Sequence, residues 1–244
     1  MQINYIIATY SAPIPSRMWD EKSEFVLETN LNCLYPILNK NITQVTIVCP
    51  KPRSEPYKNY YNKEKWIEKF KAIPHTKLEY LDYEGENTHA SYDQWIQAYL
   101  AFPNFDYYIL CEDDYTIRNK NFDVELTRIY KEKFPNNIGY LCSRAGKNSH
   151  PYHAMISNGM VSRETFQKLG KNILDIFYSK NSSFAQIKFS MLFQDDNISI
   201  LDYSEYYVVK FHPGGNKILD YSTKEGLQEE LFVPIQTILY CPEA

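Results

Sequence analysis

Short apolar runs alternate along the first half of the chain with stretches whose apolar residues recur every three or four positions. A continuous run of about four to eight apolar residues is typical of a strand buried on both faces, and the longer period is typical of an amphipathic helix. The runs predict strands at residues 3–9, 45–49, 78–81 and 107–111. The longer period predicts helices at residues 21–38, 63–72 and 91–102. Strands and helices in this order indicate a parallel sheet with right-handed crossovers.

The second half of the chain is less regular. Its pattern predicts helices at residues 122–134, 163–169 and 184–193, and strands within residues 138–142, 154–161, 198–202 and 206–211. No internal repeat, low-complexity tract or linker interrupts the sequence. We therefore expect one α/β domain over residues 1–244, a three-layer α/β/α sandwich around a mostly parallel, mixed sheet.

Composition and charge narrow the class of protein. The chain is 44% hydrophobic and 16% aromatic, which indicates a globular protein. Its net charge of −4, without a clustered basic stripe, argues against a nucleic-acid-binding surface. No stretch approaches the roughly 18 apolar residues that span a bilayer. The N-terminus lacks the basic residues and the long apolar run of a signal peptide, so we expect a cytoplasmic protein.

The cysteines agree with a reducing compartment. There are five, an odd number, and no two of them form a CxxC pair. Cys49, Cys111 and Cys142 lie within apolar, strand-like runs. The pattern gives no support to a zinc site and favours free buried thiols.

Three consecutive acids, Glu112, Asp113 and Asp114, follow the apolar run at residues 107–111. In open α/β sheets, ligands bind outside the carboxyl ends of the strands. Neighbouring carboxylates attract a cation, and oxygen ligands favour Mg²⁺ or Mn²⁺, ions that usually bring substrate phosphates with them. The alternative is an acidic turn on a surface loop, and this stretch alone leaves both interpretations open.

Two further segments join the acid cluster in resembling one family. The segment SNGMVSRETFQKL, at residues 157–169, is similar to a Ser-Arg-Glu segment that lines the acceptor side of glycosyltransferases of the GT-A fold. The segment KFSMLFQDDNISILDYS, at residues 188–204, resembles the helix and strand that follow it. The acid cluster itself resembles the DxD motif, with Glu in the first position. The resemblance spans nearly the whole chain and implies a GT-A-like sandwich. Residues 1–117 would bind the nucleotide sugar and residues 118–244 the acceptor.

The resemblance implies a metal-dependent hexosyl- or pentosyltransferase. Its donor would be a nucleotide-diphosphate sugar, with UDP as the expected nucleotide, and its acceptor a glycan or another hydroxyl. A Mn²⁺ or Mg²⁺ ion would offset the charge of the diphosphate leaving group. Asp114 is the expected direct ligand, and Glu112 would assist through water or contact the ribose. Alternation along an extended chain places these two acids on one face, so Asp113 would point back into the protein. His212 is a further candidate, since some families of this fold add a C-terminal His, although it also fits a loop before a Pro-Gly turn.

The same resemblance suggests residues on the donor and acceptor sides. The donor candidates lie at the ends of the first, third and fourth strands and at the start of the helix at 91–102: Thr9, Tyr10, Ser11, Arg17, Asp82, Tyr83, Asp93 and Asp113. The acceptor candidates are Arg144, Asn158 and Gly159, where Gly159 would remove bulk beside a ligand. Ordinary strand-end chemistry is the simpler explanation for any one of the donor candidates, and Ser91 or Asp93 could simply cap the helix.

The catalytic base is less well defined. Inverting members of the family use a carboxylate base at a position that falls near Gln186 here, and an amide cannot serve. Asp195, Asp196 and Glu164 remain as candidates, unless the enzyme is retaining. Glu164 also suits the first turn of a helix for reasons of charge alone.

Two other classes of protein stay open. A non-catalytic carbohydrate- or nucleotide-sugar-binding protein could use the same fold, and a test of metal-dependent nucleotide binding bears on this choice. A sugar nucleotidyltransferase would need a Gly-rich basic loop after its first strand. Residues 9–17, TYSAPIPSR, contain no glycine, which ranks this class low.

Overall fold

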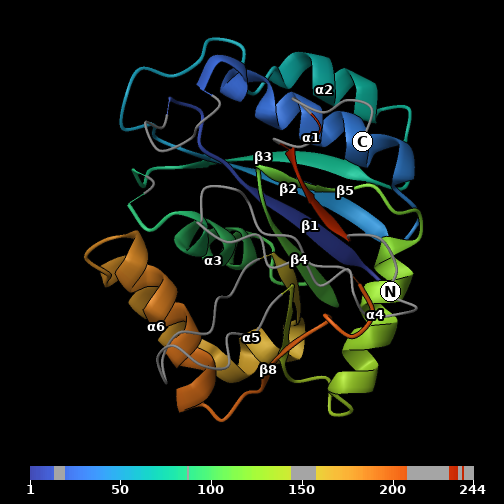
Figure 1. Ribbon diagram of the computed structural model, residues 1–244, viewed down its shortest axis with the longest axis vertical. Coiled ribbons are helices and arrows are strands. Elements are labelled where there is room, and N and C mark those ends of the chain that lie inside the picture. Colours follow the sequence, from blue (N-terminus) through green and yellow to red (C-terminus); the bar gives the residue numbers. More distant parts are fainter. Residues whose placement is uncertain (14–19, 87, 144–157, 208–230, 236–237, 239–244) are drawn as a thin grey trace.

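A seven-stranded sheet forms the centre of the protein (Figure 1). The computed structural model describes residues 1–13, 20–86, 88–143, 158–207, 231–235 and 238. The strands of the sheet lie in the order β3-β2-β1-β4-β7-β6-β8. Their bounds are β1 (Ile3–Ala8), β2 (Ile42–Pro50), β3 (Lys77–Tyr83), β4 (Tyr107–Glu112), β6 (Tyr140–Cys142), β7 (Gly159–Ser162) and β8 (Ile200–Asp202).

The sheet is mixed and mostly parallel, as the sequence predicts. β1 to β4 run parallel to one another. β7 lies antiparallel to both of its neighbours, β4 and β6, and β6 pairs in parallel with β8. β4 is the middle strand of the seven, and five of its six residues are buried. The apolar run therefore forms a central strand, as expected.

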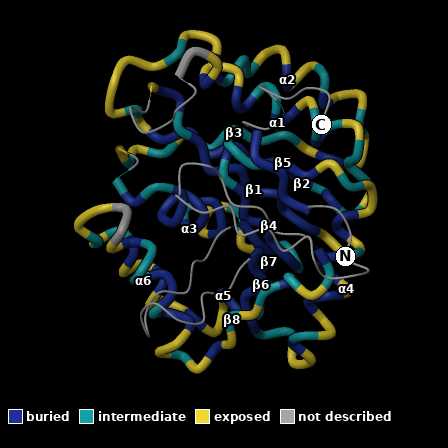
Figure 2. The backbone as a smooth tube through the Cα atoms, in the orientation of Figure 1, coloured by how far each residue is buried: buried dark blue, intermediate teal, exposed yellow. Residues whose placement is uncertain are grey.

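Helices cover both faces of the sheet (Figure 1). They are α1 (Val26–Leu34), α2 (Lys63–Phe70), α3 (Ser91–Ala101), α4 (Phe122–Lys133), α5 (Arg163–Leu169) and α6 (Ser182–Asp195). Alternate residues of a strand point to opposite faces. Accordingly Tyr5 and Ile7 of β1 pack with α1, α2 and α4, whereas Ile6 packs with α3, α5 and α6. The predicted three-layer sandwich is confirmed, with its inner strands buried and exposed residues on the outer helices (Figure 2).

Three 3₁₀ helices, η1 (Asp20–Phe25), η2 (Tyr35–Ile37) and η3 (Gly170–Tyr178), accompany the α-helices. The first two flank α1, so the single helix expected at residues 21–38 is divided into three pieces. Pro36, at the start of η2, supplies no backbone N–H for the next helical hydrogen bond. The α-helical pattern therefore ends at Leu34.

A second, two-stranded sheet was not predicted. It pairs β5 (Tyr115–Ile117), directly after the acid cluster, with β9 (Phe232–Pro234) in antiparallel register. Leu231, Phe232 and Ile235 bury their side chains in the same core as α1. A segment more than a hundred residues away in sequence therefore packs beside the acids. The strand expected at residues 206–211 lies mostly outside the described residues, and of the strand expected at 154–161 only the end, β7, is described.

Candidate active site

The acid cluster lies at the carboxyl edge of the four parallel strands. Glu112 is the last residue of β4 and stands in register with Ala8, the last residue of β1. Asp113 and Asp114 form the turn into β5. This is the edge at which open α/β sheets bind ligands, as the sequence predicts.

Two neighbouring elements hold Glu112. The hydroxyl of Ser91, at the start of α3, donates to Glu112 Oε1 at 2.7 Å. The backbone N–H of Glu112 donates to Asn158 Oδ1 at 2.8 Å. Asn158 immediately precedes β7 and is 1% exposed. Asn158, an acceptor candidate from the sequence, therefore lies beside the acids. Its burial and its bond to the chain of Glu112 make it a residue that positions an acid.

Asp113 points into the protein. It is 2% exposed, and its Oδ2 accepts hydrogen bonds from the backbone N–H of Tyr10, at 2.7 Å, and from the hydroxyl of Tyr60. Its own N–H donates to the carbonyl of Ala8 at 2.9 Å. The middle acid therefore ties the end of β1 and the loop after β2 to the acid turn.

Asn30 of α1 holds the turn from the other side. Its amide nitrogen donates to the carbonyls of Asp113, at 3.1 Å, and Tyr115, at 2.5 Å. These two carbonyls flank Asp114, whose own carbonyl accepts from the N–H of Ile235 at 2.8 Å. Asn30 is fully buried and was missed by the sequence reasoning. A signal was present, because an Asn occupies the face of this helix that also carries Leu27 and Leu31.

Helix α3 attaches the ends of β1 and β4 to one another. The carboxamide of Gln94 accepts from Thr9 N–H at 2.8 Å and donates to Thr9 O at 3.1 Å. The indole N–H of Trp95 donates to Cys111 O at 3.1 Å. The expectation that Ser91 or Asp93 caps α3 is wrong, because the helix has no side-chain cap and the Ser91 hydroxyl is engaged with Glu112.

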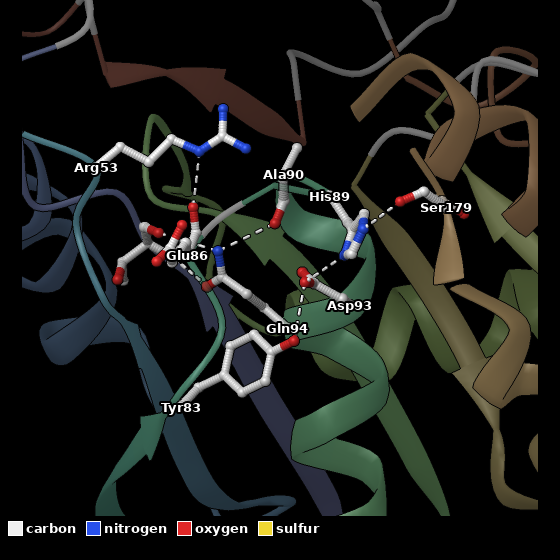
Figure 3. A network of polar contacts seen from close by, with 9 residues as sticks. Arg53, Tyr83, Glu86, His89, Ala90, Asp93, Gln94 and Ser179 are labelled. Carbon is white, nitrogen blue, oxygen red and sulfur yellow. Dashed lines mark hydrogen bonds and ion pairs between the residues drawn. The ribbon is translucent and has the colours of Figure 1, made fainter. Parts of the chain in front are cut away.

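Asp93 belongs instead to a buried polar network (Figure 3). Its Oδ2 lies 2.9 Å from His89 Nδ1 and accepts from the Tyr83 hydroxyl at 3.0 Å. The other ring nitrogen of His89 lies 2.6 Å from the carbonyl of Ser179. Burial raises the pKa of Asp93, while the hydrogen bonds from His89 and Tyr83 oppose that rise. Asp93 is 1% exposed, so it fastens α3 to η3 and is covered from any donor.

Tyrosines of the loop before α2 cover the ends of β1 and β2. Tyr57 N–H donates to Ser11 O at 2.8 Å, and the hydroxyls of Tyr61 and Thr9 lie 2.9 Å apart. Thr9 and Ser11 are each 2% exposed, whereas Tyr10 is partly exposed. Of these three donor candidates, Tyr10 is therefore the one that presents a side chain at the surface.

Asp82 and Tyr83 close β3 at the same edge. Asp82 is exposed and forms an ion pair of 2.9 Å with Lys63, the first residue of α2. Tyr83 is partly buried and directs its hydroxyl to Asp93. Among the predicted residues of this strand, Asp82 is the accessible carboxylate. Arg17, Arg144 and His212 lie outside the described residues.

The role expected for Gly159 is corrected by the packing of β7 against β6. A side-chain carbon at Gly159 would lie 2.1 Å from the carbonyl oxygen of Leu141 and 3.0 Å from Cys142 Cα. The space that the glycine leaves is therefore filled by the backbone of β6. Close approach of two strands, and not of a ligand, requires glycine here.

The three candidate bases do not meet the acids, which corrects the expected catalytic set. Glu164 lies in the first turn of α5, after β7 has returned to the amino end of β4. The N–H of Arg163 donates to the carbonyl of Asp106, just before β4, and Glu164 itself accepts from Asn137 at 2.7 Å. A six-residue strand, about 17 Å of extended chain, separates that end from Glu112.

Asp195 and Asp196 lie at the same distant edge. They end α6 and precede β8, whose first residue, Ile200, stands beside Tyr140 at the beginning of β6. The direction of β6 and β8 matches that of β4, so their amino ends share an edge. In this segment, the acid that lies on the carboxyl edge is Asp202, at the end of β8. The sequence did not point to it as a candidate base.

The metal-binding capacity of the site rests on two carboxylates. Within the described ranges, no three His, Cys, Asp or Glu side chains are grouped so as to hold an ion. Glu112 and Asp114 are both partly exposed at one turn, whereas Asp113 is buried. One or two carboxylates, completed by substrate phosphates and water, form a donor set that suits Mg²⁺. The residues present therefore fit a metal that binds together with a diphosphate.

Several solved glycosyltransferase structures are similar to this chain. GlyE, a glycosyltransferase of Streptococcus pneumoniae, aligns with 84% of the chain at 12% identity and a TM-score of 0.50. TarS 1–349 of S. aureus aligns with 82% at 13% identity and a TM-score of 0.49. A glycosyltransferase involved in the glycosylation of the major capsid of PBCV-1 aligns with 85% of the chain and 84% of its own length, at 13% identity and a TM-score of 0.47.

The chain spans 46% of the GlyE structure and 58% of the TarS structure. No family model and no curated protein sequence matches it. The chain has the fold of the GT-A-like glycosyltransferases, and at this level of identity the likeness shows the fold alone. No helix in the part of the chain that the structure describes is long and apolar enough to cross a membrane.

Proposed function

We propose that this protein transfers a sugar from a nucleotide-diphosphate sugar, with UDP as the nucleotide, to a hydroxyl of a glycan. The observation that carries the proposal is the placement of Glu112 and Asp114 at the carboxyl end of the central strand in a glycosyltransferase fold. The surrounding structure supports a site rather than a chance acidic turn. Ser91, Asn158 and Asn30 come from three separate elements and each bonds to the acids or their backbone.

The donor would lie over the ends of β1, β2 and β3. Tyr10 offers an aromatic face beside the acid turn, and Asp82 offers a carboxylate for hydroxyl groups of a ribose. Asp114 and Glu112 would hold Mn²⁺ or Mg²⁺. Such an ion supplies Lewis-acid stabilisation of the charge that grows on a diphosphate leaving group. The buried bonds of Asp113 keep the two outer acids in place while substrates exchange.

The position of the three expected bases favours a second candidate function. Glu164, Asp195 and Asp196 lie at the other edge of the sheet, so none of them reaches an acceptor bound at the acids. A protein that binds nucleotide sugars or glycans without transferring them needs no base. Turnover of a nucleotide sugar separates the two functions, because a binding protein releases its ligand intact.

Asp114→Asn provides the decisive test. The substitution keeps the shape of the side chain and removes a charge from the expected ligand. Calorimetry of UDP with Mn²⁺ should show binding to the wild type and a loss of at least about tenfold in the variant, equal to about 1.4 kcal/mol. Sugar transfer should be lost with it. Asp195→Asn removes an exposed carboxylate at the distant edge. It should change neither the affinity for UDP with Mn²⁺ nor the rate of sugar transfer. Equal affinity of the wild type and Asp114→Asn would reduce the cluster to an acidic turn.

A further inference from the structure

A hollow of about 360 Å³ lies between the end of η3 and the outer face of α6. Its apolar lining comes from Tyr178, Phe184, Ile187 and Met191, and its polar rim includes Lys180 and Lys188. The volume falls in the lower range of small-molecule sites, which begin at about 300 Å³. The opposite face of α6, with Phe189 and Phe193, is buried against the core, so the hollow is not part of the packing that holds the helix in place.

Two aromatic side chains are unusually exposed in this hollow. Tyr178 is 85% exposed and Phe184 is 53% exposed. They are the two most exposed large apolar side chains in the described part of the chain, and both line this one feature. Single exposed apolar residues are common, but two rings gathered around a concave surface indicate a binding site.

The polar groups at the rim indicate which class of ligand the hollow would bind. Lys188 is paired with Asp175 at 3.1 Å, and Lys180 is exposed beside the two rings. A saccharide matches this combination, because the C–H face of a sugar packs on an aromatic ring while its hydroxyls bond to charged and polar side chains. A protein partner would need about 800 Å² on each side, and the large apolar exposure here is confined to a few side chains.

The hollow is linked to the acid edge through a short chain of contacts. Ser179, which follows Tyr178, accepts a hydrogen bond at its carbonyl from His89 at 2.6 Å. Two residues after His89, the hydroxyl of Ser91 reaches Glu112 at 2.7 Å. Figure 3 shows the carbonyl of Ser179 facing His89 at the start of α3. The hollow therefore lies beyond α3 on the same side of the molecule as the acids.

From these observations we infer that the hollow is a saccharide-binding subsite, which holds sugar units of an oligosaccharide acceptor away from its reacting hydroxyl. The rings of Tyr178 and Phe184 stack on these units. The acceptor role rests on the proposed transferase function, whereas saccharide binding at the rings does not. The substrate class that follows is an oligosaccharide or polysaccharide long enough to reach from the acids past α3.

The first test uses an array of immobilised oligosaccharides of two or more sugar units, followed by titration of the best-bound one in solution. Tyr178→Ala and Phe184→Ala should each weaken binding by about tenfold. Tyr178→Phe keeps the ring and should retain most of the affinity. Phe25→Ala removes another exposed ring, 47% exposed on η1, and should have no effect. An array without any bound saccharide, or Ala variants that bind as tightly as the wild type, would overturn the inference.

A second measurement separates the inference from the proposed function. Hydrolysis of UDP-sugars with Mn²⁺ in the absence of acceptor reports on the acid site alone, and Tyr178→Ala should leave it unchanged. The same variant should raise KM for the oligosaccharide acceptor about tenfold and leave kcat nearly constant. If saccharide binding depends on the rings but no nucleotide sugar is turned over, the saccharide site is supported and the proposed transferase function is wrong. If the enzyme turns over nucleotide sugars and Tyr178→Ala leaves the acceptor KM unchanged, the transferase function is supported and the subsite is wrong.

Discussion

The side-chain amide of Asn30 donates a hydrogen bond of 3.1 Å to the main-chain carbonyl of Asp113. A second bond from the same nitrogen, 2.5 Å long, reaches the carbonyl of Tyr115. Helix α1 thereby holds the backbone on both sides of Asp114. The geometry of the acid turn thus depends on a residue that lies more than eighty positions earlier in the chain.

Asn30→Ala should therefore lower both stability and the affinity for UDP with Mn²⁺. Two buried carbonyls lose their donor, at a cost of about 3 kcal/mol in the free energy of unfolding. Urea denaturation measures the first effect and calorimetry the second. Asn32→Ala, an exposed position of the same helix, is the matched control and should change the unfolding free energy by less than about 0.5 kcal/mol. A neutral result at Asn30 would show that the turn holds its shape unaided.

The burial of Asp93 should make stability depend on pH. Its Oδ2 lies 2.9 Å from His89 Nδ1 and accepts from the Tyr83 hydroxyl at 3.0 Å. Burial raises the pKa of Asp93 above its ordinary value of 3.8. An acid with a raised folded pKa contributes stability that is complete below its unfolded pKa and is lost as pH rises through the folded pKa.

The melting temperature of the wild type relative to Asp93→Asn should therefore fall as pH rises from about 4 to 7. Thermal denaturation of both proteins over this range measures the difference. Asp195→Asn, at an exposed position, controls for the loss of one charge. A difference that grows with pH would mean that Asp93 is stabilised in its charged form.

Ala90, directly before α3, has a left-handed backbone with φ 56° and ψ −129°. Residues with a Cβ rarely adopt this conformation, which costs about 1–3 kcal/mol. Glycine adopts it freely but adds about 0.4–1 kcal/mol of entropy to the unfolded chain. Ala90→Gly should therefore raise the free energy of unfolding by about 1 kcal/mol. Ala98→Gly, within the same helix, should lower it by a similar or larger amount, and urea denaturation distinguishes the two.

Burial raises the pKa of the Cys49 thiol to about 12. At about pH 8 only about one molecule in ten thousand then carries the reactive thiolate. The pKa of Cys33 is also raised by burial, but this residue is only partly buried on α1. Iodoacetamide should thus modify Cys33 well before Cys49 in the native protein, as followed by peptide mass spectrometry. Equal rates in the native protein would contradict the buried placement of Cys49. As a control, the two cysteines should react at equal rates after unfolding in urea.

Local patterns predicted most of the secondary structure. The apolar run at residues 107–111 needs to be buried on both faces wherever it lies, so a central strand followed by acids could be expected from those residues alone. The same reasoning found α2, α3, α5 and α6 to within a few residues. The same reasoning gave the wrong helix end at residues 21–38. The apolar residues keep a helical spacing past Pro36, but the α-helix itself ends before this proline.

The sequence by itself therefore determined the order of the strands and helices from β1 to β4 and the edge at which Glu112 and Asp114 stand. Alternation of side chains along an extended chain already indicated that Asp113 turns away from the face of Glu112 and Asp114. Tertiary structure supplied the partners that bury Asp113, which are Tyr10 and Tyr60 from other loops. It also decided the direction of β7, whose antiparallel pairing carries Glu164 to the far edge. Strand pairing and direction are set by hydrogen bonds between segments distant in the chain, and no local period of apolar residues contains that information.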